Sequence, residues 1–218
     1  MVTTLVALGA DVEATNAGSG PLHMAAGSDM GVVETVRTLV KVGANIEPFN
    51  AEGETPLFVA IGAGRLERMR LLVELGADLE ALGPHDRSLL HHAAANGHVK
   101  MLEALVEELG LDVNDSRRNG AGPLAMAAGH GHEQAIRTLV KMGADIEAVD
   151  RQIGQRPLLM AARSGHAAAV RALVELGADI EAPSLLNAYR PLHVAAFQGH
   201  LEVMQVLMEL GANVEGYA

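Results

Sequence analysis

The sequence predicts an all-α solenoid, in which similar helix–turn–helix units stack and each unit projects a β-hairpin finger loop. Three observations lead to this fold class. One phrase recurs along the chain, its landmarks keep a constant spacing, and the composition lacks the large rings of an ordinary globular core. Apolar residues make up 49% of the 218 residues, but aromatics only 2%, and Trp is absent. Thin layers of Ala, Leu, Val and Met are therefore expected to fill the core.

Two independent landmarks share one period of 33 to 35 residues. The first is a Pro-Leu pair, in which Leu takes the place of Pro once; its first residues are Pro21, Pro56, Leu89, Pro123, Pro157 and Pro191. The second is the Gly that opens "GAD" and related phrases, at Gly9, Gly43, Gly76, Gly110, Gly143, Gly177 and Gly211. A period in this range indicates stacked repeats and not one closed globule.

Each repeat contains two helices and a loop. Pro suits the first helical position, where its missing N–H has no partner, so "PLHVAA" opens a short Ala-rich inner helix. A Gly in a left-handed turn ends that helix. An outer helix such as "AAAVRALVEL" follows, with apolar residues at helical spacing, and the next Gly ends it. About a dozen residues remain, which is too long for a tight turn and predicts an extended hairpin finger.

The phrases "GPLHMAA" from Gly20, "TPLFVAI" from Thr55 and "RPLHVAA" from Arg190 resemble the T-P-L-H-x-A signature of the ankyrin repeat. The resemblance covers essentially the whole chain. It implies a single ankyrin-repeat domain over residues 1–218 that binds other proteins through its finger tips and the exposed, concave face of its inner helices. A partial repeat at 1–15 precedes six full repeats at 16–49, 50–82, 83–116, 117–149, 150–183 and 184–218.

The ten histidines do not suggest a metal site. His23, His91 and His193 stand at the "TPLH" position, where the resemblance implies hydrogen bonds that hold the finger. Most of the others occupy a "GH" turn that recurs with the repeat, at His98, His132, His166 and His200. The histidines that lie close together in sequence, His91 with His92 and His130 with His132, lack the ligand spacing and supporting carboxylates of a metal centre.

The same reasoning argues against an enzyme. The glycines and most carboxylates recur with the repeat, and no nucleophile–base pair or phosphate loop stands apart. No cofactor is therefore expected.

A net charge of −11 disfavours binding to nucleic acid and to anionic lipid. The first residues lack a basic signal-peptide region, and no apolar run is long enough to span a membrane. We expect an intracellular, cytoplasmic protein, although a secreted effector fits the same sequence.

Function is expected where the repeats differ. Arginines gather on the fingers and inner helices of the later repeats, at Arg87, Arg117, Arg118, Arg151, Arg156, Arg163 and Arg190, whereas the second finger carries Glu52 and Glu54. Rare aromatics and leucines accompany the arginines, at Leu185, Leu186, Tyr189 and Phe197. Arg and aromatic residues are enriched at interface hot spots. We expect these side chains to contact another protein with an acidic segment; an apolar cover for the end of the stack is the alternative.

Two of these arginines break a local rule, because Arg156 and Arg190 stand at the helix N-cap that Thr55 fills in the second repeat. A cation is unfavourable there, and a Ser or Thr cap contributes about 1 kcal/mol. A ligand carboxylate would compensate. Neutral drift, or pairing with Asp150 or Glu181, are the alternatives.

The chain ends support a second hypothesis, a structural spacer or a self-assembling array. Solenoids usually carry polar end caps. Here Leu5 and Val6 have no preceding repeat, and Leu201, Met204 and Met208 resemble ordinary internal residues. These apolar ends are expected either to meet another chain or to continue into further repeats.

Overall fold

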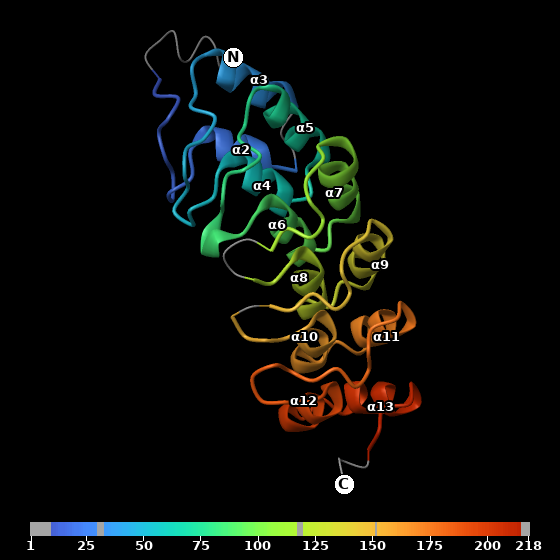
Figure 1. Ribbon diagram of the computed structural model, residues 1–218. Coiled ribbons are helices and arrows are strands. Elements are labelled where there is room, and N and C mark those ends of the chain that lie inside the picture. The colour runs from blue at the N-terminus through green and yellow to red at the C-terminus, as the bar shows by residue number, and fades with distance from the viewer. Residues whose placement is uncertain (1–9, 30–32, 117–119, 151, 215–218) are drawn as a thin grey trace. The chain divides into compact units, whose positions relative to one another are not determined.

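The computed structural model describes residues 10–29, 33–116, 120–150 and 152–214, and these residues form helices joined by loops (Figure 1). The chain divides into two compact units, residues 1–92 and 93–218. We call them the N-terminal and C-terminal units. The prediction of a single domain stays a prediction. The expectation about Leu5 and Val6 lies outside the described residues.

The N-terminal unit pairs inner helices with inner helices and outer helices with outer helices. Its elements are α2 (Pro21–Gly27), α3 (Val33–Lys41), α4 (Pro56–Gly62), α5 (Leu66–Glu74) and the 3-10 helix η1 (Pro84–Asp86), while α6 (Leu89–Ala95) spans the division between the units. The inner helix α2 packs on α4, and the outer helix α3 packs on α5. Leu57, Phe58, Ile61, Met69 and Leu72 are fully buried between them. Each repeat therefore buries its apolar face against its neighbour.

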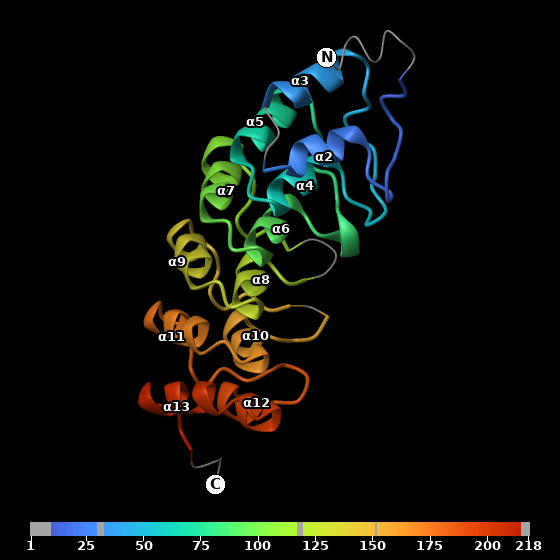
Figure 2. The ribbon, with the colours of Figure 1, turned by 180° about the vertical axis from the view of Figure 1, so that it is seen from behind.

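Within the C-terminal unit the helices also form an inner row and an outer row (Figures 1 and 2). The inner row is α8 (Pro123–Gly129), α10 (Pro157–Ser164) and α12 (Pro191–Gln198); the outer row is α7 (Val99–Glu103), α9 (Glu133–Lys141), α11 (Ala167–Glu175) and α13 (Leu201–Glu209). A π-helical turn, η2 (Ala104–Glu108), follows α7 directly. The third repeat has one residue more here than the second, "LVEELGLD" against "LVELGAD", so the insertion widens a helix instead of lengthening a loop.

The predicted helix starts and stops are confirmed. Pro opens the inner helices α2, α4, α8, α10 and α12, and the glycines of the turns have positive φ. Gly131 shows why Gly is needed, with φ 77° and a His166 ring so close that an added Cβ would lie 2.7 Å from it. Gly143 also has positive φ (95°), but open space surrounds it. The first glycine therefore meets two requirements and the second only one.

The fingers differ from the predicted hairpins in one respect. Among the described residues the only β-pairing is an isolated bridge between Asn16 and Ser19, so the fingers are loops and not paired strands. Backbone hydrogen bonds close them, as from Asp150 N to the Gln155 carbonyl at 2.9 Å. The side chain at the base of the finger then caps the turn, because Asp150 Oδ1 accepts the Gln152 N–H at 2.7 Å. Such Asx turns satisfy the backbone without a second strand.

Candidate interaction surface

The structure accounts for the two unusual arginine caps within the chain. Thr55 accepts the Phe58 N–H at 3.5 Å, but Arg156 and Arg190 make no side-chain cap. Arg190 is only 7% exposed and donates to Glu181 Oε2 at 2.6 Å. Pairing with Glu181 is therefore the arrangement found, and it links the cap to the loop that precedes its own finger.

Arg156 is engaged in the same way. Its Nε lies 3.0 Å from Glu147 Oε2, and its terminal nitrogen donates to the Pro183 carbonyl at 2.6 Å. Both arginines thus connect an inner helix to neighbouring finger loops. The sequence pattern suggested that both guanidinium groups could bind a ligand carboxylate. In the structure, neither of them is open to a partner.

Arg163 and Phe197 have a different environment. Both stand six residues after the Pro that opens their inner helix, a register at which the other repeats carry Gly27, Gly62, Ala95 and Gly129. Arg163 is exposed, and no carboxylate pairs with it in the described part of the chain. Phe197 is 79% exposed. The last two repeats therefore display large side chains where earlier repeats have almost none.

The last finger adds an apolar surface to the C-terminal unit. Leu186 is 72% exposed, and with Leu185 it borders a cavity of about 510 Å³ whose other lining includes Gly154. The Leu185 N–H donates to the Gly154 carbonyl at 2.9 Å, which joins two successive fingers. Tyr189 packs beside His193, with ring centroids 6.2 Å apart.

Helix α12 separates these residues into two groups. Tyr189 and Arg190 lie at its N-terminal end, and Phe197 lies near its C-terminal end, so roughly 10 Å of helix axis separates them. The patch predicted from the sequence is therefore spread along one inner helix. Of the remaining arginines, Arg87 is half-buried on a finger of the N-terminal unit, and Arg117, Arg118 and Arg151 lie outside the described residues.

The histidines have structural contacts. His23 Nδ1 accepts the Gly20 N–H at 3.2 Å, and Nε2 donates to the carbonyls of Pro48 and Glu54, both at 3.0 Å, so this ring holds the finger as expected. The "GH" histidines brace successive repeats, as in the bond from His166 Nε2 to the Gly129 carbonyl at 3.1 Å. The described residues hold no group of three or more side chains suited to a metal ion.

Sequence reasoning missed a second set of braces, made by the glutamate of each "GADIE" phrase. Glu147 Oε1 accepts the Asp179 N–H of the following repeat at 2.8 Å, and Glu181 Oε1 accepts the Asn213 N–H at 2.7 Å. In the N-terminal unit, Glu47 receives the N–H of Asp78 in the same way. Burial raises the pKa of Glu47, and the Asp78 hydrogen bond opposes this rise. The recurrence of these carboxylates with the repeat is the sequence signal that could have indicated inter-repeat contact.

The sequence comparison decides the family. A family profile described as "Ankyrin repeats (3 copies)" matches residues 1–82, 80–150 and 147–217. The chain belongs to the ankyrin repeat family. No match to a curated protein was found.

Solved structures show the same fold for this ankyrin repeat chain. The human ASB11 ankyrin repeat domain superposes with a TM-score of 0.79 at 24% identity, covering 98% of this chain and 93% of that one. The ankyrin repeat domain of Bcl-3, a member of the IkappaB protein family, gives a TM-score of 0.72 at 29% identity, covering 91% and 89%. The predicted all-α ankyrin solenoid is thereby confirmed. In the residues described, every helix is too short or too polar to cross a bilayer.

Proposed function

We propose that this ankyrin repeat chain binds another protein through the inner-helix and finger surface of its C-terminal unit, without catalysis. Ankyrin repeat domains are protein-interaction modules, which supports the general role. The observation that carries the specific surface is the exposure of Phe197 (79%) and Leu186 (72%), the two most exposed large apolar side chains among the described residues. Exposed aromatic and apolar groups beside an Arg are typical of interface hot spots.

The chemistry of the partner follows from Arg163. Because Arg156 and Arg190 are engaged inside the chain, Arg163 is the described arginine on the inner helices of the C-terminal unit that an acidic residue of the partner can reach. Leu186 and Tyr189 then contact an apolar side chain of the partner at the other end of α12. The partner segment is expected to combine one acidic residue with apolar residues.

A phage-displayed library of random peptides tests this surface. Peptides selected on the intact chain should lose at least ten-fold in affinity for Phe197→Ser and for Arg163→Glu. Glu202→Lys, on an outer helix, is the control for a charge change elsewhere. Peptides that bind all variants equally would show that the binding surface lies elsewhere.

The alternative is self-association through the last repeat. Leu201 is 71% exposed, whereas Ala167, its counterpart in the preceding repeat, is 8% exposed. Met208 is exposed on the same helix. Light scattering across protein concentration tests this hypothesis: Leu201→Glu with Met208→Glu should remove any dimer. A dimer that persists in this double variant would exclude the end face as its contact.

A further inference from the structure

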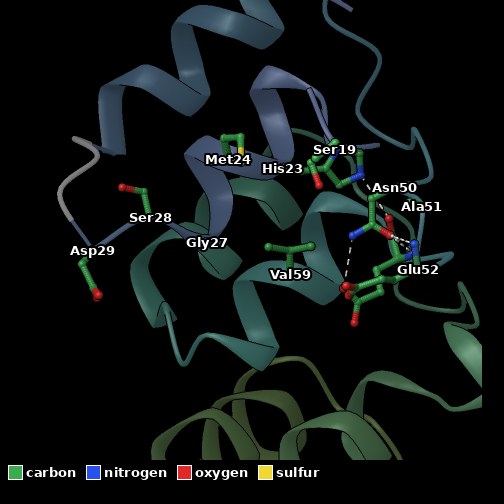
Figure 3. Close-up of a pocket in the computed structure, with 12 residues that line it drawn as sticks. Ser19, His23, Met24, Gly27, Ser28, Asp29, Asn50, Ala51, Glu52 and Val59 are labelled. Atoms are coloured by element: carbon green, nitrogen blue, oxygen red, sulfur yellow. Dashed lines mark hydrogen bonds between the residues drawn. The ribbon is translucent and has the colours of Figure 1, made fainter. Parts of the chain in front are cut away.

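A groove in the N-terminal unit lies far in sequence from the surface proposed above. It has a volume of about 490 Å³. One side is formed by the first two fingers, with Ser19 and the segment 50–52, and the floor by Met24 and Val59 of the inner helices α2 and α4 (Figure 3). Asp29 borders the opposite end.

Gly27 lines the groove at the register that holds Arg163 in the fifth repeat. Helix α2 lies so close to α4 that a Cβ on Gly27 would be 2.8 Å from Val59 Cγ1. Gly27 therefore lets the two inner helices approach closely and adds no side chain to the groove. The same register is therefore hollow in the first repeat and occupied by a large side chain in the fifth.

The floor of the groove exposes an apolar side chain. Met24 is 63% exposed, whereas Met126 and Met160, at the same register of later repeats, are half-buried. An unbranched thioether adapts to different apolar shapes and is common on surfaces that bind peptides. Met24 thus supplies an apolar contact that the fold itself does not use.

The finger side of the groove is acidic and well ordered by hydrogen bonds. Asn50 Oδ1 accepts the N–H groups of Glu52 and Glu54 at 2.9 and 2.8 Å, which fixes the backbone under both carboxylates. Glu54 Oε2 also accepts from Asn50 Nδ2 at 3.2 Å. The Glu52 carboxylate is exposed, and no cation pairs with it among the described residues.

The charges also give the groove a direction. At the far end, Asp29 is already paired with Arg65, whose Nε donates to the Gly27 carbonyl at 3.3 Å. A ligand cation is therefore attracted to the fingers and not to Asp29. A Lys or Arg side chain suits this arrangement, because its alkyl stem can cover Met24 while its charge reaches Glu52.

We propose that this groove binds a basic, extended segment of a partner protein, with a Lys or Arg on Glu52 and an apolar neighbour on Met24. Charge complementarity selects this occupant, since an acidic segment would meet the unpaired carboxylate of Glu52. The proposal concerns a different surface from the one on the C-terminal unit and does not depend on it. The two surfaces would take segments of opposite charge.

Fluorescence anisotropy of the whole chain with a labelled Lys-Leu-Lys-Leu-Lys peptide tests the proposal. The dissociation constant should rise about ten-fold for Glu52→Lys and about three-fold for Met24→Ala, and binding should weaken with salt. Glu52→Gln removes the charge without reversing it and should give an intermediate loss. Circular dichroism checks that each variant keeps its helices.

Controls separate a built site from general attraction to an acidic protein. Glu202→Lys makes the same charge change on an outer helix and should leave the affinity unaltered, as should Phe197→Ser. Equal losses for Glu52→Lys and Glu202→Lys would overturn the proposal. Unchanged affinity in both Met24→Ala and Glu52→Lys would also overturn it. So would a Glu-Leu-Glu-Leu-Glu peptide that binds the chain as tightly as the Lys-Leu peptide. None of these outcomes bears on the surface of the C-terminal unit.

Discussion

Removing the Glu181 carboxylate should destabilise the C-terminal unit far more than removing a surface carboxylate. Arg190 is 7% exposed, and its terminal nitrogen forms an ion pair with Glu181 Oε2 at 2.6 Å. Breaking a buried pair by deleting one member costs about 3–5 kcal/mol. Since the Glu181 side chain is partly open to water, the lower figure, about 3 kcal/mol, applies. The lost bond from the Asn213 N–H adds about 1 kcal/mol.

A matched control lies on the outer helices. Glu175 accepts from Arg137 at the same 2.6 Å, but both side chains are more than a third exposed. Exposed ion pairs contribute about 0–1 kcal/mol. Glu175→Ala should therefore lower stability far less than Glu181→Ala, even though the two contacts have equal lengths. Burial, and not distance, sets the difference.

A second substitution tests the cause. In the double variant Glu181→Ala with Arg190→Thr, the buried cation is gone and a Thr stands at the N-cap, as Thr55 does in the second repeat. At least half of the lost stability should return. Urea unfolding followed by tyrosine fluorescence suits the measurement, because the chain has two tyrosines and no Trp, and Tyr189 adjoins the site. Equal losses for Glu181→Ala and Glu175→Ala, or no recovery in the double variant, would refute the reasoning.

Three further predictions concern single positions. Ala188 has a positive φ of 55°, so Ala188→Gly should raise stability by about 0.5–1 kcal/mol, whereas the same change at Ala168 in helix α11 should lower it by about 1 kcal/mol in thermal unfolding. Gly131→Ala should destabilise more than Gly143→Ala in urea, because both positions have positive φ but only the first has a histidine ring in the way. Burial raises the pKa of Glu47, so the folded state favours its protonated form, and the contribution of this carboxyl to stability falls as pH rises through that pKa. Glu47→Gln should therefore gain melting temperature relative to wild type at neutral pH, with the gain shrinking in acid; a constant difference across pH would contradict this.

The fold could be predicted from the sequence because the repeat states the same local chemistry many times. A Pro at a helix start and a Gly at a helix end act within a few residues, so one sequence window contains both cause and effect. The conformation of the fingers was predicted only in part, because it depends on side-chain hydrogen bonds that the loop length does not reveal. Asp150 and Ser184 cap their turns through side chains, and this satisfies the backbone without the strand pairing that the loop length suggested.

The surface was harder to predict, because a side chain's availability depends on the neighbouring repeat. Arg156 and Arg190 are conspicuous in sequence, but glutamates at Glu147 and Glu181 engage them. Their positions within the repeat predicted that both arginines lie on the binding face. Only the geometry shows that they connect helices to fingers.

Charged side chains that recur with the repeat form contacts between successive repeats. Arg137 pairs with Glu175 and Arg171 with Glu209, each one repeat further along, and the glutamates of the "GADIE" phrases accept backbone N–H groups across the same step. A solenoid offers each periodic side chain a periodic partner. The residues left for an external ligand are those that break the register, and Glu52 and Arg163 both do so. Mutating such aperiodic charges should change binding with little effect on stability, while mutating periodic ones such as Glu181 should do the reverse.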